Sequence, residues 1–233
     1  MDVAIQSLPL LFKGLELTLI ITLGSVSIGC IFGMIAGLSR LSSKRWMRLL
    51  GTTYVDFFRG TPLLVQILLV YYGIPVLLQD GQAYLMHTFG MSQLLHNYAM
   101  PRLIAAIIAC SLNSGAYIAE IFRAGVQSIE KGQMEAARSL GMTHGVAMRY
   151  IILPQAIKRV IPPLGNEFIA MLKDTSLLSV IGIIELTKSG MLVVARTYEA
   201  FAIYITVAIF YLVITFTLSR YIDYLERRLK TSD

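Results

Sequence analysis

Four runs of apolar residues in this chain contain no Asp, Glu, Lys or Arg. They cover residues 17–39, 60–79, 103–119 and 200–219. A helix of about 20 mostly apolar residues crosses the hydrocarbon layer of a bilayer, which is about 30 Å thick. Each run therefore predicts a membrane-spanning helix.

A fifth run, residues 160–184, is apolar except for Glu167, Lys173 and Asp174. An ionisable group at membrane depth is costly and normally has a partner or a function. We therefore predict a fifth spanning helix that faces protein or water rather than lipid. The predicted fold is an all-α integral membrane protein with five transmembrane helices, in a single domain of residues 1–233.

Basic residues gather in three of the segments outside these helices. Five lie between the first and second helices, six between the third and fourth, and four in the C-terminal tail, which together make 15 of the 20 in the chain. Cytoplasmic loops are enriched in Lys and Arg. The pattern predicts an outside N-terminus and a cytoplasmic C-terminus. No basic residue precedes Lys13, so a signal peptide is not indicated and we expect the first helix to be retained.

The composition agrees with a lipid-covered protein. Hydrophobic residues make up 56% of the chain and charged residues 15%, against about 25% charged in soluble domains. The net charge of +6 is explained by the topology signal, so we do not expect a nucleic-acid partner. Cys30 and Cys110 lie in apolar runs and are expected to be packing residues. The histidines have no metal-site spacing, and no residues suggest a catalytic triad, so we predict no metal, no cofactor and no enzyme activity on this chain.

The first predicted helix has small residues at every fourth position: Ser25, Gly29, Gly33 and Gly37. Small residues at this spacing form a ridge that another helix can approach closely. The pattern predicts a packing ridge, and leaves open whether its partner is a helix of this chain or of another subunit.

The segment 123–159 is too polar to cross a bilayer. Glu130, Met134, Ala137 and Gly141 would share one face of a short helix there, and that face is small enough to lie in a groove of another protein. A helix resting on lipid headgroups is the alternative, although such helices normally carry bulky apolar residues. We expect the prolines at 154, 162 and 163 to end any helix in this part of the chain.

One motif in this segment resembles a known family. Glu135-Ala136-Ala137, then Gly141 after three residues, then the pattern I-x-L-P at 151–154 after nine more, is similar to the EAA loop of bacterial ABC importer permeases. Four other segments resemble the branch that carries polar amino acids such as glutamine, histidine, arginine and cystine. They are FRGTPL at 58–63, NSGAYIAE at 113–120, PLGNE at 163–167 and KDTSL at 173–177. The outer loop at 80–100 is longer than this resemblance suggests.

The resemblance implies a permease subunit of the bacterial inner membrane that imports a polar amino acid. It implies a second permease subunit, identical or homologous, and an extracytoplasmic binding protein that delivers the substrate. It also implies ATPase subunits, which carry ATP and Mg and dock on the EAA loop at Glu135, Ala136, Ala137 and Gly141. This chain has no Gly-Lys pair and therefore no phosphate-binding P-loop. An ion-coupled secondary transporter and a membrane scaffold protein remain as alternatives.

Polar residues within the predicted helices are candidates for the substrate site. Asn113, Tyr117 and Glu120 share one helical face, and Arg59 and Gln66 are seven residues apart. An amino acid carries a carboxylate and an ammonium group, which Arg and acidic side chains bind by charge-assisted hydrogen bonds. The predicted substrate-binding residues are Arg59, Gln66, Asn113, Tyr117, Glu120 and Asp174. The structural alternatives are ion pairs of Arg59 with Asp56, Glu120 with Arg123, and Lys173 with Glu167.

Overall fold

A computed structural model describes residues 2–90, 92 and 98–229, and this part of the chain consists of helices and short connections without strands. The longer helices are α1 (Asp2–Leu41), α2 (Arg45–Gly60), α4 (Ile74–Phe89), α5 (Arg102–Gln127), α8 (Leu153–Asp174), α9 (Leu186–Thr197) and α10 (Ala200–Leu229). The shorter ones are α3 (Leu63–Leu68), α6 (Lys131–Ser139) and α7 (His144–Ala147). Two π-helical turns, η1 (Leu69–Gly73) and η2 (Met148–Ile152), and a 3₁₀ segment, η3 (Thr175–Ile181), join some of them.

Four helical stretches are long and apolar enough to cross a membrane: Val3–Leu41, Leu63–Phe89, Arg102–Gln127 and Ala200–Leu229. A fifth candidate, His144–Ile181 with Leu186–Thr197, is bent by 48° at a short break. The described structure therefore has four or five candidate spans. The all-helical class is confirmed, while five spans and the orientation of the chain remain predictions.

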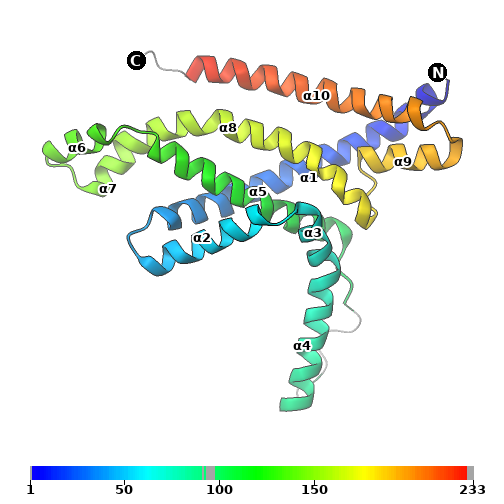
Figure 1. The fold of residues 1–233 in the computed structure, drawn as a ribbon, viewed down its shortest axis with the longest axis horizontal. Coiled ribbons are helices and arrows are strands. Elements are labelled where there is room, and N and C mark those ends of the chain that lie inside the picture. Colours follow the sequence, from blue (N-terminus) through cyan, green and yellow to red (C-terminus); the bar gives the residue numbers. More distant parts are fainter. Residues whose placement is uncertain (1, 91, 93–97, 230–233) are drawn as a thin grey trace.

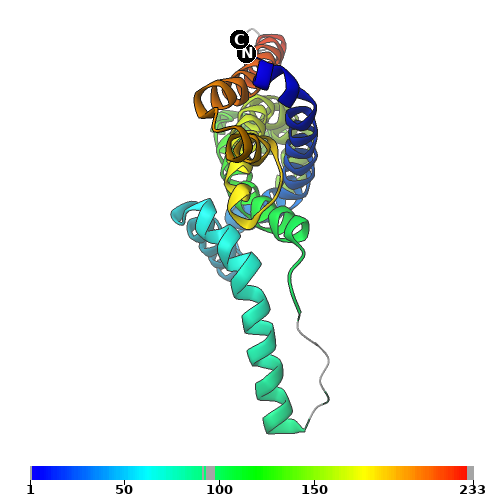
Figure 2. The same ribbon diagram turned by 90° about the vertical axis from the view of Figure 1, so that its right-hand side faces the viewer.

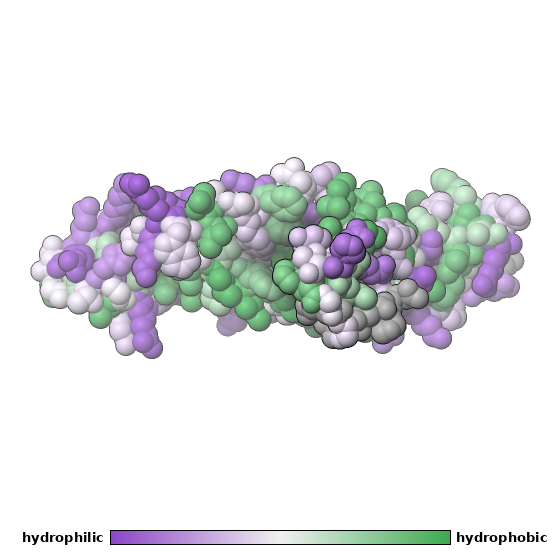
Figure 3. Space-filling view, turned by 90° about the horizontal axis from the view of Figure 1, so that it is seen from below, coloured by the Kyte–Doolittle hydropathy of each residue, from purple (hydrophilic) through white to green (hydrophobic). Residues whose placement is uncertain are grey.

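The long helices α1, α5, α8 and α10 run along the length of the molecule (Figure 1). The turn between α1 and α2, the pair α6 and α7, and the C-terminal end of α10 lie at one end, whereas the N-terminus and α9 lie at the other (Figure 1). Hydrophilic side chains gather at the end with α6 and α7, and hydrophobic ones cover much of the surface between the two ends (Figure 3). The three predicted cytoplasmic segments thus share one end.

The helix α4 leaves this bundle and projects away from it in both views (Figures 1 and 2). The π-helical turn η1 precedes it and Pro75 lies in its first turn, so the regular backbone bonding is interrupted where the chain turns outward. Much of the loop predicted at 80–100 is in fact the second half of α4. His96 and the rest of 93–97 lie outside the described residues.

The small-residue ridge of α1 packs against α5 of the same chain. A Cβ added at Gly29 would lie 3.1 Å from the backbone nitrogen of Gly115, and one at Gly33 would lie 2.8 Å from the carbonyl oxygen of Gly115. A Cβ at Gly37 would lie 3.0 Å from the carbonyl oxygen of Ala119. Only hydrogen at these positions allows the backbones to approach so closely. The predicted ridge is confirmed, and its partner is a helix of this chain.

The expectation that prolines end the helices of this region is wrong. The helix α8 begins beside Pro154 and continues through Pro162 and Pro163 to Asp174. Each of these prolines lacks the N–H that would bond the carbonyl four residues before it. Spanning helices tolerate such losses because neighbouring groups satisfy the freed carbonyls. The predicted loop 123–159 is also shorter than expected, because α5 extends to Gln127 and α8 starts at Leu153.

A buried carboxylate fixes the start of α9. Glu185 is inaccessible to solvent, and its carboxylate accepts hydrogen bonds from the backbone N–H groups of Thr187 at 2.8 Å and Lys188 at 2.7 Å. The Tyr211 hydroxyl on α10 also donates to it at 3.2 Å. The side chain therefore caps α9 and joins it to α10, which holds the bend after α8 in place.

Candidate functional site

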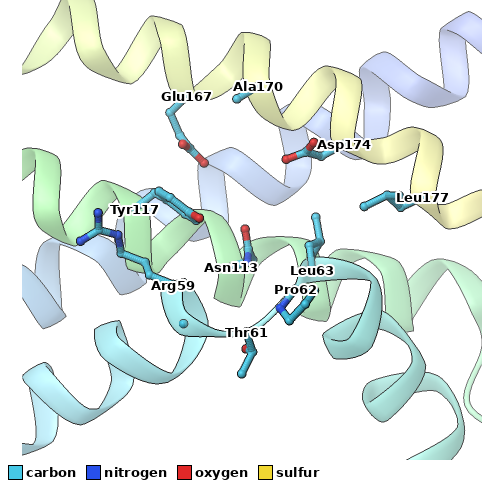
Figure 4. A pocket seen from close by; sticks show the side chains of 11 residues that line it. Arg59, Thr61, Pro62, Leu63, Asn113, Tyr117, Glu167, Ala170, Asp174 and Leu177 are labelled. Atoms are coloured by element: carbon cyan, nitrogen blue, oxygen red, sulfur yellow. The ribbon is translucent and has the colours of Figure 1, made fainter.

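A cavity of about 560 Å³ lies between the α2–α3 corner, α5 and α8. Its walls combine charged, polar and small apolar side chains, which Figure 4 shows at close range. They belong to Arg59, Gly60, Thr61, Pro62, Leu63, Asn113, Tyr117, Glu167, Ala170, Asp174 and Leu177. The cavity is large enough for an amino acid, and its polar groups come from helices that are distant in the sequence.

The corner between α2 and α3 is held by Gln66. Its amide nitrogen donates hydrogen bonds to the carbonyl oxygens of Phe58 at 2.8 Å and Thr61 at 3.0 Å. Its amide oxygen accepts a bond of 3.0 Å from the side-chain nitrogen of Asn113 on α5. Gln66 is buried and is not among the lining residues. It therefore positions the corner and Asn113 rather than facing the cavity.

The wall formed by α8 is acidic. Glu167 and Asp174 are two helical turns apart, and both carboxylates point into the space between α8 and α5 (Figure 4). The Ser114 hydroxyl on α5 donates a 2.8 Å hydrogen bond to Oε1 of Glu167. Asn113 points its amide oxygen toward the same wall, because its nitrogen is bonded to Gln66 (Figure 4). The wall presents acceptor oxygens suited to an ammonium group.

The opposite side carries Arg59, the last cation of α2. Its guanidinium lies over the ring of Tyr117, with 5.4 Å between the guanidinium carbon and the ring centroid. A cation in this position is attracted by the aromatic ring. Its Nη1 is also 4.0 Å from Oε2 of Glu120, whereas Asp56, the predicted partner, forms no ion pair found among the described residues.

Glu120 lies beside the cavity, within a group of arginines. Its Oε2 is 2.6 Å from Nη1 of Arg40 on α1, and its carboxylate also accepts hydrogen bonds from Arg123 one turn further along α5. Both contacts are charge-assisted hydrogen bonds, which are stronger than neutral ones. The alternative pairing of Glu120 with Arg123 is thus present, and Glu120 is not among the residues that line the cavity.

The structure brings together four of the six residues predicted to bind substrate: Arg59, Asn113, Tyr117 and Asp174. Gln66 and Glu120 lie behind them. Glu167, which the prediction did not include, lines the cavity with Asp174. The spacing of seven residues between these two acids was the signal that could have identified it, because such residues share a helical face.

The residues of the EAA motif are found on α6 and just after it. Glu135, Ala136 and Gly141 are exposed, whereas Ala137 is 1% exposed and faces the chain itself. Since α6 packs against η2 and α7, the small side chain of Ala137 lets this helix lie close to them. Gly141 has φ +83° and forms the turn that ends α6.

Comparison with known proteins decides the class. Residues 29–231 match the family described as "Binding-protein-dependent transport system inner membrane component". The chain belongs to this family. The glutamine transport system permease protein GlnP of Escherichia coli (strain K12) is 38% identical over 224 residues, which cover 96% of this chain and 94% of that protein. The L-cystine transport system permease protein TcyB of Bacillus subtilis (strain 168) is 39% identical, over 95% of this chain and 87% of that protein.

A solved structure agrees with these relatives of the family. A crystal structure of an amino acid ABC transporter with histidines superposes with a TM-score of 0.83 at 43% identity, and 96% of each chain is covered. The predicted resemblance to ABC importer permeases is therefore confirmed. Membership of this family identifies the chain as a transport subunit rather than an enzyme. Among the described residues, no group of three or more His, Cys, Asp or Glu side chains is arranged to hold a metal ion.

Proposed function

We propose that this chain imports a polar amino acid across the bacterial inner membrane and that the cavity beside Arg59 is its substrate site. The observation that carries the proposal is the placement of opposite charges on two walls: Arg59 on one side, and Glu167 with Asp174 on the other. An α-amino acid has a carboxylate and an ammonium group at fixed separation. A cavity with one cation and two acids offers partners to both.

The two ends of the substrate are assigned by charge. Arg59 presents planar, paired N–H donors, which match a carboxylate. The acids of α8 and the amide oxygen of Asn113 accept hydrogen bonds from the ammonium group. The similar proteins carry different amino acids by name, glutamine in one and cystine in another, so the side chain of the substrate is left to the rest of the cavity and to the binding protein.

Membership of the family and the exposed surface of α6 support the proposed partners. An ATPase subunit, with its ATP and Mg, docks in this proposal against Glu135, Ala136 and Gly141, which are accessible at one end of the molecule. The second permease subunit holds a second ATPase subunit in the same way. Ala137 supports this surface from below. A second permease subunit, identical or homologous, and an extracytoplasmic amino-acid-binding protein complete the transporter, with the N-terminus outside and the C-terminus in the cytoplasm.

Transport into proteoliposomes tests the function. Uptake of radiolabelled glutamine, arginine, histidine or cystine is expected to require ATP, the ATPase subunits and the binding protein. An ion-coupled secondary transporter would instead respond to an ion gradient without ATP. A scaffold protein would give no uptake in either condition.

Neutral substitutions test the cavity. Arg59→Gln and Asp174→Asn remove one charge each, and a hydrogen bond to a charged group is worth about 1.5–3 kcal/mol, or about 10- to 150-fold in affinity. We expect the half-saturating substrate concentration to rise accordingly. Lys173→Gln is the matched control, because Lys173 is adjacent, exposed and not a lining residue. Equal behaviour of Asp174→Asn and Lys173→Gln would contradict the assignment.

A further inference from the structure

One carboxylate serves three arginines beside the cavity. In the ion pairs found among the described residues, Arg40, Arg59 and Arg123 all have Glu120 as their acidic partner. These four side chains come from α1, α2 and α5, so the cluster joins three helices. Its charges do not balance, because one negative charge faces three positive ones. The cluster can therefore accept a further carboxylate.

The three arginines are not held equally. Arg40 and Arg123 make direct hydrogen bonds to Glu120, and their side chains are 17% and 28% exposed. Arg59 is 4.0 Å from Glu120 and 41% exposed. An exposed pair at that distance contributes little, and a guanidinium has five N–H donors to offer. Of the three arginines, Arg59 is therefore the one whose guanidinium is most available to bind a ligand.

The position of Arg59 at the cavity supports this difference. Its side chain extends along Tyr117, with the guanidinium on the far side of that ring from Asp174 (Figure 4). In this position it lies toward Glu120 rather than between the cavity walls. A substrate whose ammonium group is bound by the acids of α8 would bring its carboxylate to Arg59 from the cavity, on the side away from Glu120.

We propose that Glu120 is a positioning residue that pairs with Arg59 when no substrate is bound, and that the substrate carboxylate displaces Glu120 as the partner of Arg59. This inference rests on the proposed function of the cavity. Glu120 then competes with the substrate instead of binding it, which reverses the role that its helical position suggests. Arg40 and Arg123 keep Glu120 in place when Arg59 leaves. The arrangement favours ligands with a free carboxylate, because only a negatively charged group replaces the ion pair that Arg59 loses with Glu120.

The two possible roles of Glu120, ammonium ligand or competitor for Arg59, predict opposite changes in ligand affinity when Glu120 is substituted. If Glu120 binds the ammonium group, shortening or neutralising it lowers the affinity for every ligand with that group. If Glu120 competes for Arg59, the same changes raise the affinity for ligands with a free carboxylate. Ligands without that carboxylate are not affected in this way. The affinity for the free amino acid divided by the affinity for its α-carboxamide therefore reports the competition. The ratio is also independent of the amount of folded protein.

The experiment uses the complex of this permease with its ATPase in lipid nanodiscs. Binding of L-glutamine and L-arginine is compared with binding of their α-carboxamides, which keep the ammonium group and lack the carboxylate. Glu120→Asp preserves the charge but shortens the side chain and withdraws it from Arg59. We expect it to raise the affinity for the free acid about two- to fivefold, the range of an exposed ion pair, without a gain for the carboxamide. Glu120→Gln is expected to act in the same direction.

Asp223→Glu is the control, since Asp223 pairs with Arg220 on α10 at 3.7 Å and lies outside this cluster. The ratio of the affinities for free amino acid and α-carboxamide in Asp223→Glu should equal that of the wild type. An unchanged or lower ratio in Glu120→Asp overturns the proposed competition. If Arg59→Gln nevertheless weakens binding of the free acid more than of the carboxamide, the cavity remains the substrate site and only the role of Glu120 falls. If Arg59→Gln leaves both affinities unchanged, the substrate site is wrong and the competition falls with it.

Discussion

The hydroxyl of Ser114 on α5 donates a 2.8 Å hydrogen bond to Oε1 of Glu167 on α8, and this bond crosses one wall of the cavity. Ser114 is completely buried. Ser111, one turn earlier on the same helix, is also buried, yet its hydroxyl has no hydrogen-bond partner among the residues that the structure describes. The two serines therefore differ in what their hydroxyls do, although the sequence gives them the same setting on a membrane helix.

Ser114→Ala is expected to destabilise the protein more than Ser111→Ala. The first change removes a bond between helices, which contributes about 0.6 kcal/mol on average and up to about 1.7 kcal/mol inside membranes. The second removes a buried polar group without a partner, which is neutral or stabilising. Thermal unfolding of the purified permease in detergent measures the difference. Equal melting temperatures for the two variants would show that the bond to Glu167 contributes nothing.

Gly33→Ala is expected to disturb the packing of α1 against α5. The new Cβ would lie 2.6 Å from a side-chain carbon of Ile118 and 2.8 Å from the carbonyl oxygen of Gly115, and a change of side-chain rotamer cannot relieve the contact with the carbonyl oxygen. Overpacking of this kind costs about 1–3 kcal/mol. Gly24→Ala is the control, because a Cβ there meets nothing within 4 Å. The melting temperature of the Gly33→Ala variant should fall below that of the wild type, whereas that of the Gly24→Ala variant should stay level or rise.

The sequence predicted the helices well because their signals are local. Runs without charge indicated the long apolar helices that are candidate spans, and the four-residue spacing of small residues predicted the ridge on α1. The partner of the ridge could not be predicted, because it depends on how Gly115 and Ala119 of α5 are placed in space. The continuation of α8 through its prolines was missed for the same reason, since the groups that compensate for the lost bonds belong to other parts of the fold.

The residues that line the cavity were predicted only in part. Helical spacing grouped Asn113, Tyr117 and Glu120, but it did not separate the residues that face the cavity from Glu120, whose carboxylate is bonded by Arg40 from α1. That contact joins residues 80 apart in the chain. Gln66 was likewise assigned to the substrate, whereas the turn after α2 uses its amide. A polar side chain such as that of Gln66 can bond the backbone instead of a ligand, and only the three-dimensional geometry distinguishes the two roles.

Cysteine labelling tests the orientation of the chain. In a background with Cys30→Ala and Cys110→Ala, single cysteines at Lys44, Arg138 and Arg227 should react with a membrane-impermeant reagent only after the membrane is opened. Cysteines at Gln82 and Arg196 should react in intact spheroplasts, because the positive residues place these segments on the other side. Labelling of position 138 from outside would show that the predicted orientation is wrong. The proposed contact of α6 with the cytoplasmic ATPase would then be wrong as well.

Gly141 forms the turn that ends α6 in a left-handed conformation, with φ +83°. A residue with a side chain is strained in this conformation, at a cost of about 1–3 kcal/mol, and an added Cβ would meet nothing of this chain within 4 Å. Gly141→Ala is therefore expected to disturb the turn. With the ATPase docked as proposed, the new side chain would also hold that subunit away. We expect co-purification of the ATPase to fall about tenfold, which corresponds to about 1.4 kcal/mol. Gly81→Ala on α4 is the control, since it too has open space around it.

Gly141→Asn separates the two causes, because Asn adopts positive φ more readily than Ala but has a larger side chain. If strain of the turn alone matters, the Asn variant retains more ATPase than the Ala variant. If the ATPase approaches the backbone at this point, Asn retains as little as Ala or less, and this is the result that docking at Gly141 predicts. Wild-type co-purification and transport in both variants would place the ATPase contact elsewhere on the molecule, and Glu135 and Ala136 would lose their assigned role with it.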